Sequence, residues 1–189
     1  MPSIDYNYIL RIINDLNIDN NFINFVETGT WKGDTILKME PYFQFLYTIE
    51  IEKELYDTVK SIYKGDKINF ILGDSSYEIS NISKSLQNNT IFFLDGHWSS
   101  GDTGKGEKDC PLYEELQSIN DNFLFEGIVI IDDVRLFGKG PNNGNELVNW
   151  EDINEKHIIN ILKNRINKYF YTESQICEND RLVIYINKM

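Results

Sequence analysis

The chain contains the stretch Phe25-Val26-Glu27-Thr28-Gly29-Thr30-Trp31-Lys32-Gly33-Asp34-Thr35. A short apolar run ends here in an acid, and two glycines four residues apart, Gly29 and Gly33, lead into a helical pattern. This order predicts the first strand, a tight turn and a helix of an open α/β sheet, because glycine is needed where the backbone turns sharply or approaches a ligand closely. The free N–H groups at the start of such a helix suit an anionic or polar ligand group.

The rest of the chain alternates between strand-like and helix-like segments. Helices are predicted at residues 4–16, 53–63, 76–86, 112–119 and 152–166, and strands at 22–27, 45–51, 67–72, 91–95 and 128–133. Two last strands, 169–176 and 182–186, are close enough in sequence to form an antiparallel hairpin. The pattern predicts an α/β, Rossmann-like fold with a mostly parallel seven-stranded sheet, helices on both faces and a C-terminal antiparallel hairpin.

Composition narrows the class of protein. With 189 residues we expect a single domain spanning residues 1–189. The net charge of −12 disfavours nucleic acid and anionic membranes as partners, because phosphate neutralisation needs clustered lysine and arginine. The start of the chain has no basic region leading an apolar one, and Cys110 and Cys177 fit neither a zinc spacing nor a disulfide framework. These features favour a cytoplasmic protein; a homodimer stays open.

Acidic residues follow nearly every predicted parallel strand. Because the carboxyl ends of parallel strands meet at the binding edge of an open α/β sheet, these acids are expected to converge there. They are Glu27, Glu50, Asp74, Asp95, Asp132 and Asp133. The alternative for any one of them is an ordinary turn former or helix N-cap. Convergence of all six through turn chemistry alone is the weaker explanation.

Position along the sheet suggests different roles for these acids. Glu50 ends the strand beside the glycine turn, where an acid can accept both hydroxyls of a ribose, and Asp74 can receive an adenine amino group. Asp95, Asp132 and Asp133 can surround a hard divalent cation, which takes oxygen ligands. Neighbouring strand residues point to opposite faces, so Asp132 and Asp133 can share one ion only if the chain turns there.

These residues resemble the class I S-adenosylmethionine-dependent methyltransferases over nearly the whole chain. Residues 27–33 are similar to the first motif of the macrocin-type O-methyltransferases, which methylate sugar hydroxyls, and Leu94-Asp95-Gly96 with Ile131-Asp132-Asp133 is similar to their magnesium site. Thr48-Ile49-Glu50 and Leu94-Asp95-Gly96-His97-Trp98 also resemble catechol O-methyltransferase.

The resemblance implies a set of site residues and two cofactors. S-adenosyl-L-methionine would be held by Glu27, Thr28, Gly29, Thr30, Gly33, Glu50, Asp74, Ser75, Asp95 and Trp98. Mg²⁺ or another divalent cation would be held by Asp95, Asp132 and Asp133, and Asp95 or His97 would act as the base. His97 can equally lie against the adenine or face solvent. The implied acceptor is a small molecule or glycan, with a sugar hydroxyl as the methylated group.

The chain also departs from the macrocin type. It is shorter, the polar stretch 96–109 is longer, and Val134-Arg135 follows the acid pair in place of an aromatic and a small residue. Acceptor contacts are therefore not carried over. Other readings are a catechol-like or other small-molecule acceptor, a nicotinamide-dependent oxidoreductase, and a cofactor-binding domain without catalysis. Residues 27–33 do not have the Gly-x-Gly-x-x-Gly fingerprint that is usual in nicotinamide-dependent oxidoreductases.

The glycine-rich stretch 96–109 is expected to be a lid over the crevice. It fails the Walker pattern for a phosphate-binding loop, because Ser99 stands at the first glycine position and Gly106 follows the lysine. Lys105 and Lys108 either meet an anionic acceptor, such as a nucleotide sugar, or are simply solvated.

Overall fold

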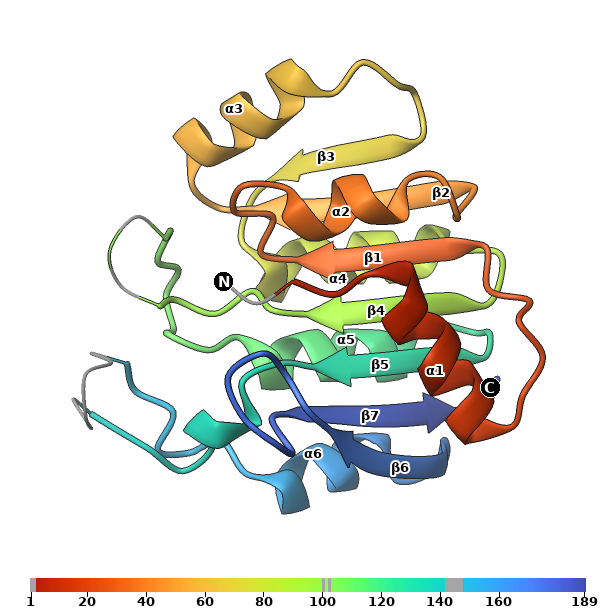
Figure 1. Ribbon diagram of the computed structural model, residues 1–189. Helices are drawn as coiled ribbons and strands as arrows, with labels where there is room; N and C mark the ends of the chain where they lie inside the picture. The colour runs from red at the N-terminus through yellow and green to blue at the C-terminus, as the bar shows by residue number, and fades with distance from the viewer. Residues whose placement is uncertain (1–2, 100, 102, 142–147) are drawn as a thin grey trace.

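The computed structural model describes residues 3–99, 101, 103–141 and 148–189. The sequence also predicts a glycine-rich loop at 135–149. This loop and the predicted lid at 96–109 lie partly outside the described residues, at 142–147 and at 100 and 102. The described part folds around one seven-stranded sheet in the order β3-β2-β1-β4-β5-β7-β6 (Figure 1). Its strands are β1 Asn24–Thr28, β2 Phe45–Glu50, β3 Ile68–Leu72, β4 Thr90–Leu94, β5 Gly127–Ile131, β6 Ile166–Thr172 and β7 Arg181–Ile186.

The direction of the strands confirms the predicted fold. Strands β1 to β5 pair in parallel, whereas β7 runs antiparallel to both β5 and β6. Strands β1, β4 and β5 are buried along their whole length, as expected for central parallel strands covered on both faces. The β6–β7 hairpin adds the antiparallel edge.

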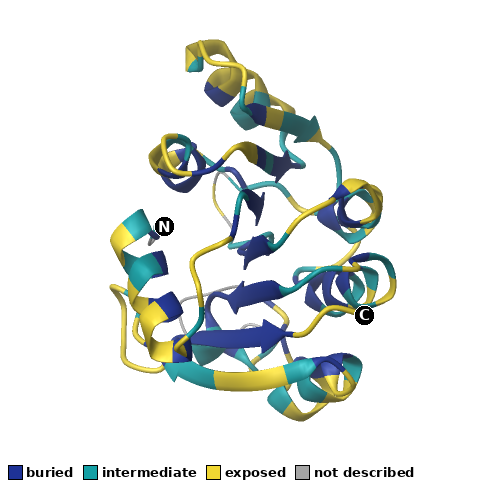
Figure 2. Cartoon of the chain, turned by 90° about the vertical axis from the view of Figure 1, so that its right-hand side faces the viewer, coloured by how far each residue is buried: buried dark blue, intermediate teal, exposed yellow. Residues whose placement is uncertain are grey.

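Helices cover the two faces of the sheet. On one face, α1 (Tyr6–Leu16) and α2 (Asp34–Met39) pack on Phe25, Ile91 and Ile128. On the other, α4 (Ser75–Ser85), α5 (Leu112–Asn122) and α6 (Glu155–Leu162) pack on Val26, Phe92 and Val129, while α3 (Lys53–Ile62) contacts β2 and β3. Figure 2 shows the result, with buried strands between helices that keep an exposed outer side.

One predicted helix is wrong in extent. Residues 152–166 were expected to be helical, but α6 begins at Glu155, after Asn154 caps it by accepting from the His157 N–H at 2.9 Å. It ends at Leu162, and Ile166 already belongs to β6, which ends at Thr172 rather than 176. The break is fixed by buried Arg165, whose guanidinium donates to the carbonyls of Ile119 and Phe125. This tertiary contact overrides the helical periodicity.

The register of the parallel strands aligns their carboxyl ends. Thr28 lies opposite Ile49 and Leu94, and Leu94 lies opposite Ile131. The residues that follow these strands therefore reach the same edge of the sheet, as the sequence predicts. After β5 the chain turns at once into a short 3₁₀ helix, η1 (Val134–Leu136), within the stretch expected to be a loop.

Candidate active site

A cavity opens at the carboxyl edge of the sheet, where the turns after β1 to β4 meet. It holds about 530 Å³ of empty space, partly open to solvent. Seven of the predicted site residues line it: Gly29, Glu50, Asp74, Ser75, Asp95, His97 and Trp98. We call it the donor cavity.

The glycine turn after β1 is built for close approach. Gly29 has φ +81°, and a Cβ atom placed on it would lie 2.3 Å from the carbonyl oxygen of Asp95. Its N–H donates to the Ile49 carbonyl at 3.0 Å. Since any side chain at this position would push the turn away from β4, glycine here holds the ends of β1, β2 and β4 together.

Glu50 lies beside this turn, as the sequence predicts. One carboxylate oxygen accepts from the Trp31 N–H at 2.8 Å, and the other accepts from the Glu52 N–H at 2.8 Å. Burial raises the pKa of Glu50 above its ordinary value, and the backbone hydrogen bonds oppose that rise. The carboxylate is thus fixed in orientation on the wall of the donor cavity.

The other residues of the first motif make hydrogen bonds and packing contacts around the glycine turn. Glu27 is 2% exposed and accepts from the Thr48 hydroxyl at 2.8 Å. Burial raises the pKa of Glu27 to about 8. Thr30 contacts Thr48 at 2.5 Å between hydroxyl oxygens, and Thr28 accepts from the Asp95 N–H at 3.2 Å. Gly33 (φ +78°) precedes α2, packed against Val59. Glu27, Gly29, Thr30 and Asp95 also line a smaller cavity of about 250 Å³.

Asp74 and Trp98 reach the donor cavity with partners of their own. One oxygen of Asp74 caps α4, accepting from the Ser76 N–H at 2.9 Å and the Ser76 hydroxyl at 2.6 Å. The N-cap alternative for this acid is therefore confirmed, which leaves only its other oxygen for a ligand. Lys105 places its Nζ 4.0 Å from the centre of the Trp98 ring.

The acid pair after β5 is bound by arginines. Asp132 is 1% exposed and accepts from Arg181 Nε at 3.0 Å, and it also accepts from the Asp133 N–H at 3.1 Å. The backbone of Asp133 is left-handed (φ 62°, ψ 34°), an uncommon conformation for a residue with a side chain. This turn sends the two carboxylates to different partners.

Asp133 contacts Arg135 and His97. It accepts a hydrogen bond from Arg135, and His97 Nε2 lies 2.7 Å from its Oδ2. Burial by itself raises the pKa of Asp133, but His97 and Arg135 outweigh it and lower that pKa to about 2. Arg135 also donates to Asp180 at 2.8 Å, so one guanidinium bridges two buried acids.

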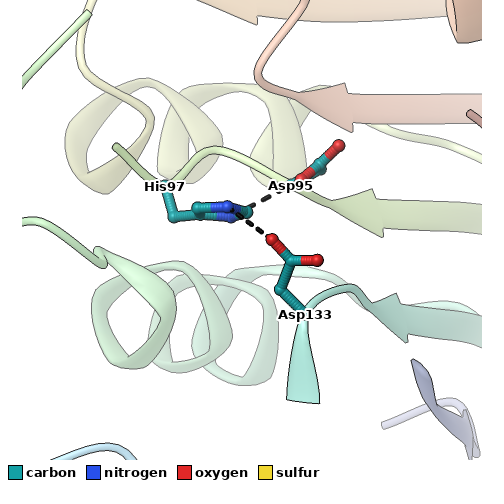
Figure 3. A group of neighbouring side chains, drawn as sticks. All are labelled: Asp95, His97 and Asp133. Carbon is teal, nitrogen blue, oxygen red and sulfur yellow. Dashed lines mark ion pairs between the residues drawn. The ribbon is translucent and has the colours of Figure 1, made fainter. Parts of the chain in front are cut away.

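Figure 3 shows His97 facing both Asp95 and Asp133, with an ion-pair contact to each. Its Nδ1 lies 3.5 Å from Asp95 Oδ1. Burial and then the charges of Asp132 and Asp133 raise the pKa of Asp95 well above its ordinary value. The predicted metal set differs from this arrangement. Among the described residues, the groups whose ligand atoms all lie within 4.8 Å of one another are Asp95–His97–Asp133 and Asp132–Asp133–Asp180.

Two residues of the site were not found from the sequence. Glu115 on α5 is 2% exposed, its Oε1 has no hydrogen-bond partner, and burial raises its pKa to about 7. An acid within the apolar stripe of Leu112, Leu116 and Ile119 was the available signal. Trp150, whose ring meets His97 edge-on at 4.8 Å, follows a loop without any periodic pattern and gave no signal.

Comparison with known proteins shows the fold. No protein-family model and no curated protein sequence matches the chain. Among solved structures, the N-methyltransferase NodS from Bradyrhizobium japonicum WM9 matches with a TM-score of 0.59 and 11% identity, over 97% of this chain and 96% of that one. A S-adenosylmethionine-dependent methyltransferase from Clostridium acetobutylicum ATCC 824 matches with a TM-score of 0.59 and 12% identity, over 98% and 92%.

A third solved structure is an rRNA methylase from Streptococcus thermophilus, with a TM-score of 0.57 and 12% identity over 95% of this chain and 96% of that one. The chain therefore has the class I fold of S-adenosylmethionine-dependent methyltransferases. At these identities the likeness concerns the fold. Among the described residues no helix is long and apolar enough to cross a membrane.

Proposed function

We propose that this chain is a S-adenosylmethionine-dependent O-methyltransferase that acts on a hydroxyl of a sugar or glycan unit. The observation that carries the proposal is the donor cavity. Its wall carries an oriented carboxylate, Glu50, beside a glycine turn, on a fold shared with methyltransferases. The sugar hydroxyl comes from the resemblance of residues 27–33, 94–96 and 131–133 to the macrocin type.

The residues around the donor cavity fit this cofactor. A carboxylate offers about four lone-pair sites, so Glu50 can accept from ribose hydroxyls while it holds its two backbone N–H groups. Among the described residues, neither Glu27 nor Glu50 pairs with a cationic side chain. Two buried acids left without a cation favour a positively charged ligand, and S-adenosylmethionine carries an ammonium and a sulfonium. The indole Nε1 of Trp31, buried without a partner, adds a free donor.

The cofactor, when bound, supplies an electrophilic methyl group. The chain must align the acceptor and remove its proton, and alignment can contribute roughly 7–11 kcal/mol. Asp95 lines the donor cavity, and its raised pKa makes its carboxylate a better base than an ordinary aspartate. His97 Nε2 lies 2.7 Å from Asp133 Oδ2 and its Nδ1 lies 3.5 Å from Asp95 Oδ1, so the imidazole faces both carboxylates. In this scheme Asp95 would take the acceptor proton, while the methyl group would leave the sulfonium sulfur of the cofactor for the acceptor oxygen.

The magnesium ion implied by the resemblance fits these residues poorly. Asp132 is held by Arg181, and Asp133 is held by Arg135 and His97. The group Asp95–His97–Asp133 includes an imidazole, whereas Mg²⁺ prefers six oxygen ligands in near-octahedral geometry. We therefore derive no step through a metal.

An amine is the second candidate for the methylated group. Asp95 and Glu27 line one small cavity, and a pair of acids suits an ammonium group. One of the solved structures with this fold is an N-methyltransferase. An RNA acceptor is disfavoured by the net charge of −12.

Calorimetry and turnover test the proposal. We expect S-adenosylhomocysteine to bind and NAD not to bind, because Glu50 lies beside a methyltransferase-type turn. We expect turnover to S-adenosylhomocysteine with glycosides, and its loss in Asp95→Asn with donor binding retained. Tight NAD binding without S-adenosylhomocysteine binding would refute the proposal.

A further inference from the structure

A second, larger groove lies next to the donor cavity, and Lys108 lines both. It runs between residues 105–114 and 149–153 and encloses about 990 Å³, open to solvent. Its lining combines two aromatic rings with charged side chains, chiefly Lys105, Glu107, Lys108, Tyr113, Trp150 and Asp152. We call it the outer groove.

The outer groove connects to the site through shared walls. Trp150 and Cys110 also line an inner cavity of about 200 Å³, whose other walls include His97 and Asp132. His97 in turn lines the donor cavity. The lining of the inner cavity thus combines residues of the groove with residues of the donor cavity, and the rings of Trp150 and His97 lie 4.8 Å apart.

The lysines of the outer groove are already neutralised by acids of the chain. Lys105 lies 2.7 Å from Asp109, and Lys108 forms an ion pair with Glu114. Among the described residues, Glu107 and Asp152 have no cationic partner, so the groove carries a negative excess. A phosphate group would meet this excess without a free cation to balance it.

The groove also offers polar groups that the chain itself leaves unused. Trp150 is 2% exposed, and its Nε1 and the buried Oε2 of Glu114 have no hydrogen-bond partner among the residues that the structure describes. Tyr113 is rigidly placed, because its hydroxyl donates to the Asp152 carbonyl at 2.7 Å and accepts from the Asn154 N–H at 2.8 Å. A donor, an acceptor and fixed aromatic rings suit a polyhydroxylated ligand.

We propose that the outer groove binds the acceptor and selects glycosides without phosphate, including amino sugars, over phosphorylated and nucleotide-linked sugars. This inference rests on the proposed methyl transfer. It excludes the possibility, left open by the sequence, that Lys105 and Lys108 receive an anionic acceptor, since both pair with acids.

Saturation-transfer NMR with S-adenosylhomocysteine present tests the selectivity without requiring turnover. The probes are methyl glucoside, glucosamine, glucose 6-phosphate and UDP-glucose. We expect signal from the first two and at least about tenfold weaker binding of the last two, which corresponds to about 1.4 kcal/mol. Preferential binding of a phosphorylated probe, or no binding of either unphosphorylated probe, overturns the inference. Calorimetry of S-adenosylhomocysteine in the same samples reports separately on the proposed function.

Two charge reversals at neighbouring residues test whether the charge of the outer groove, rather than that of the whole protein, disfavours phosphorylated sugars. Asp152 lines the groove, whereas its exposed neighbour Glu151 does not, so Asp152→Lys and Glu151→Lys change the net charge equally. We expect Asp152→Lys to strengthen binding of glucose 6-phosphate several-fold and Glu151→Lys to leave it unchanged. Equal effects would reflect the general field of the protein and would count against the groove.

Trp150→Phe keeps an aromatic ring and removes the unpartnered Nε1. We expect methyl glucoside binding to weaken by about 2–10-fold, the value of one hydrogen bond, and the melting temperature to fall modestly because the smaller ring leaves a gap in the core. Unchanged binding would remove Trp150 from the acceptor site.

Discussion

The acids at the two sides of the sheet edge are treated in opposite ways. At the ends of β1 and β2, Glu27 and Glu50 are held only by hydroxyl and backbone N–H donors. After β5, Asp132 and Asp133 are each paired with an arginine. Both sides are buried, so the difference lies in whether the chain supplies the balancing charge.

This difference separates the β1–β2 side, where a cationic ligand can bind, from the β5 side, where arginines of the chain already balance the acids. Leaving buried carboxylates without a cation destabilises the folded chain, and a cationic ligand can recover that free energy on binding. The acids after β5 are already paired with arginines, so binding of a cation there would recover no such free energy. The comparison therefore favours a cationic donor at β1–β2 and predicts that the acid pair after β5 requires no added ion.

The largest expected effect comes from unbalancing the β5 side. In Arg181→Met, Asp132 stays buried at 1% exposure without its partner, and we expect a loss of about 3–5 kcal/mol in the free energy of unfolding. Urea denaturation measures it. The double variant Arg181→Met/Asp132→Leu should recover most of the loss, because it removes the orphaned charge. A loss below about 1 kcal/mol in the single variant would contradict the assigned ion pair.

The positions of the strands along the chain were accessible from the sequence, because apolar runs, glycine turns and terminal acids are local signals. The Gly29 turn and Glu50 lie where the pattern places them, since both depend only on the register of parallel strands. The partner of Asp132 was not accessible. Arg181 lies about fifty residues away in the sequence, and no local pattern indicates which cation an acid will meet.

The second expected effect concerns the β1–β2 side. Replacing Glu50 with Gln removes the charge and turns one acceptor oxygen into a donor that faces a backbone N–H. Hydrogen bonds to a charged group contribute about 1.5–3 kcal/mol, so S-adenosylhomocysteine should bind roughly 10–150-fold more weakly. Calorimetry measures this, with Glu52→Gln as the control, since Glu52 does not line the donor cavity. Equal losses in both variants would remove Glu50 from the donor site.

A third, smaller effect is a change in the pH dependence of stability. Glu27 has a folded pKa of about 8 and an ordinary value of 4.5, so the folded state holds its proton longer. The stability linked to this proton is complete below pH 4.5 and is lost as the pH rises toward about 8. Glu27→Gln should therefore flatten the decline between pH 5 and 8 and stabilise the ligand-free chain at the upper end.

Thermal melts of the ligand-free protein at pH 5 and pH 8 check this. Some slope should persist in Glu27→Gln, because Glu115, with a pKa of about 7, contributes in the same direction. Glu115→Gln is thus the matched variant, and the two changes together should flatten the curve further. A steeper decline in Glu27→Gln would show that Glu27 is ionised and balanced in the folded state, like the acids after β5.

The smallest expected effect is that of removing divalent metal. This experiment tests whether the acids after β5 are balanced by arginines alone or also by a metal ion. We expect EDTA to leave the methyl transfer rate unchanged, because Arg181 and Arg135 already balance Asp132 and Asp133. Loss of activity in EDTA, restored by one added metal, would place an ion in the site. The ligands would then be Asp95, His97 and Asp133, so His97→Ala would abolish the restoration. If Asp132→Asn also abolished the restoration of activity by metal, the ion would have to displace Arg181 from Asp132. The acids of the β5 side would then need an external cation, as those of the β1–β2 side do.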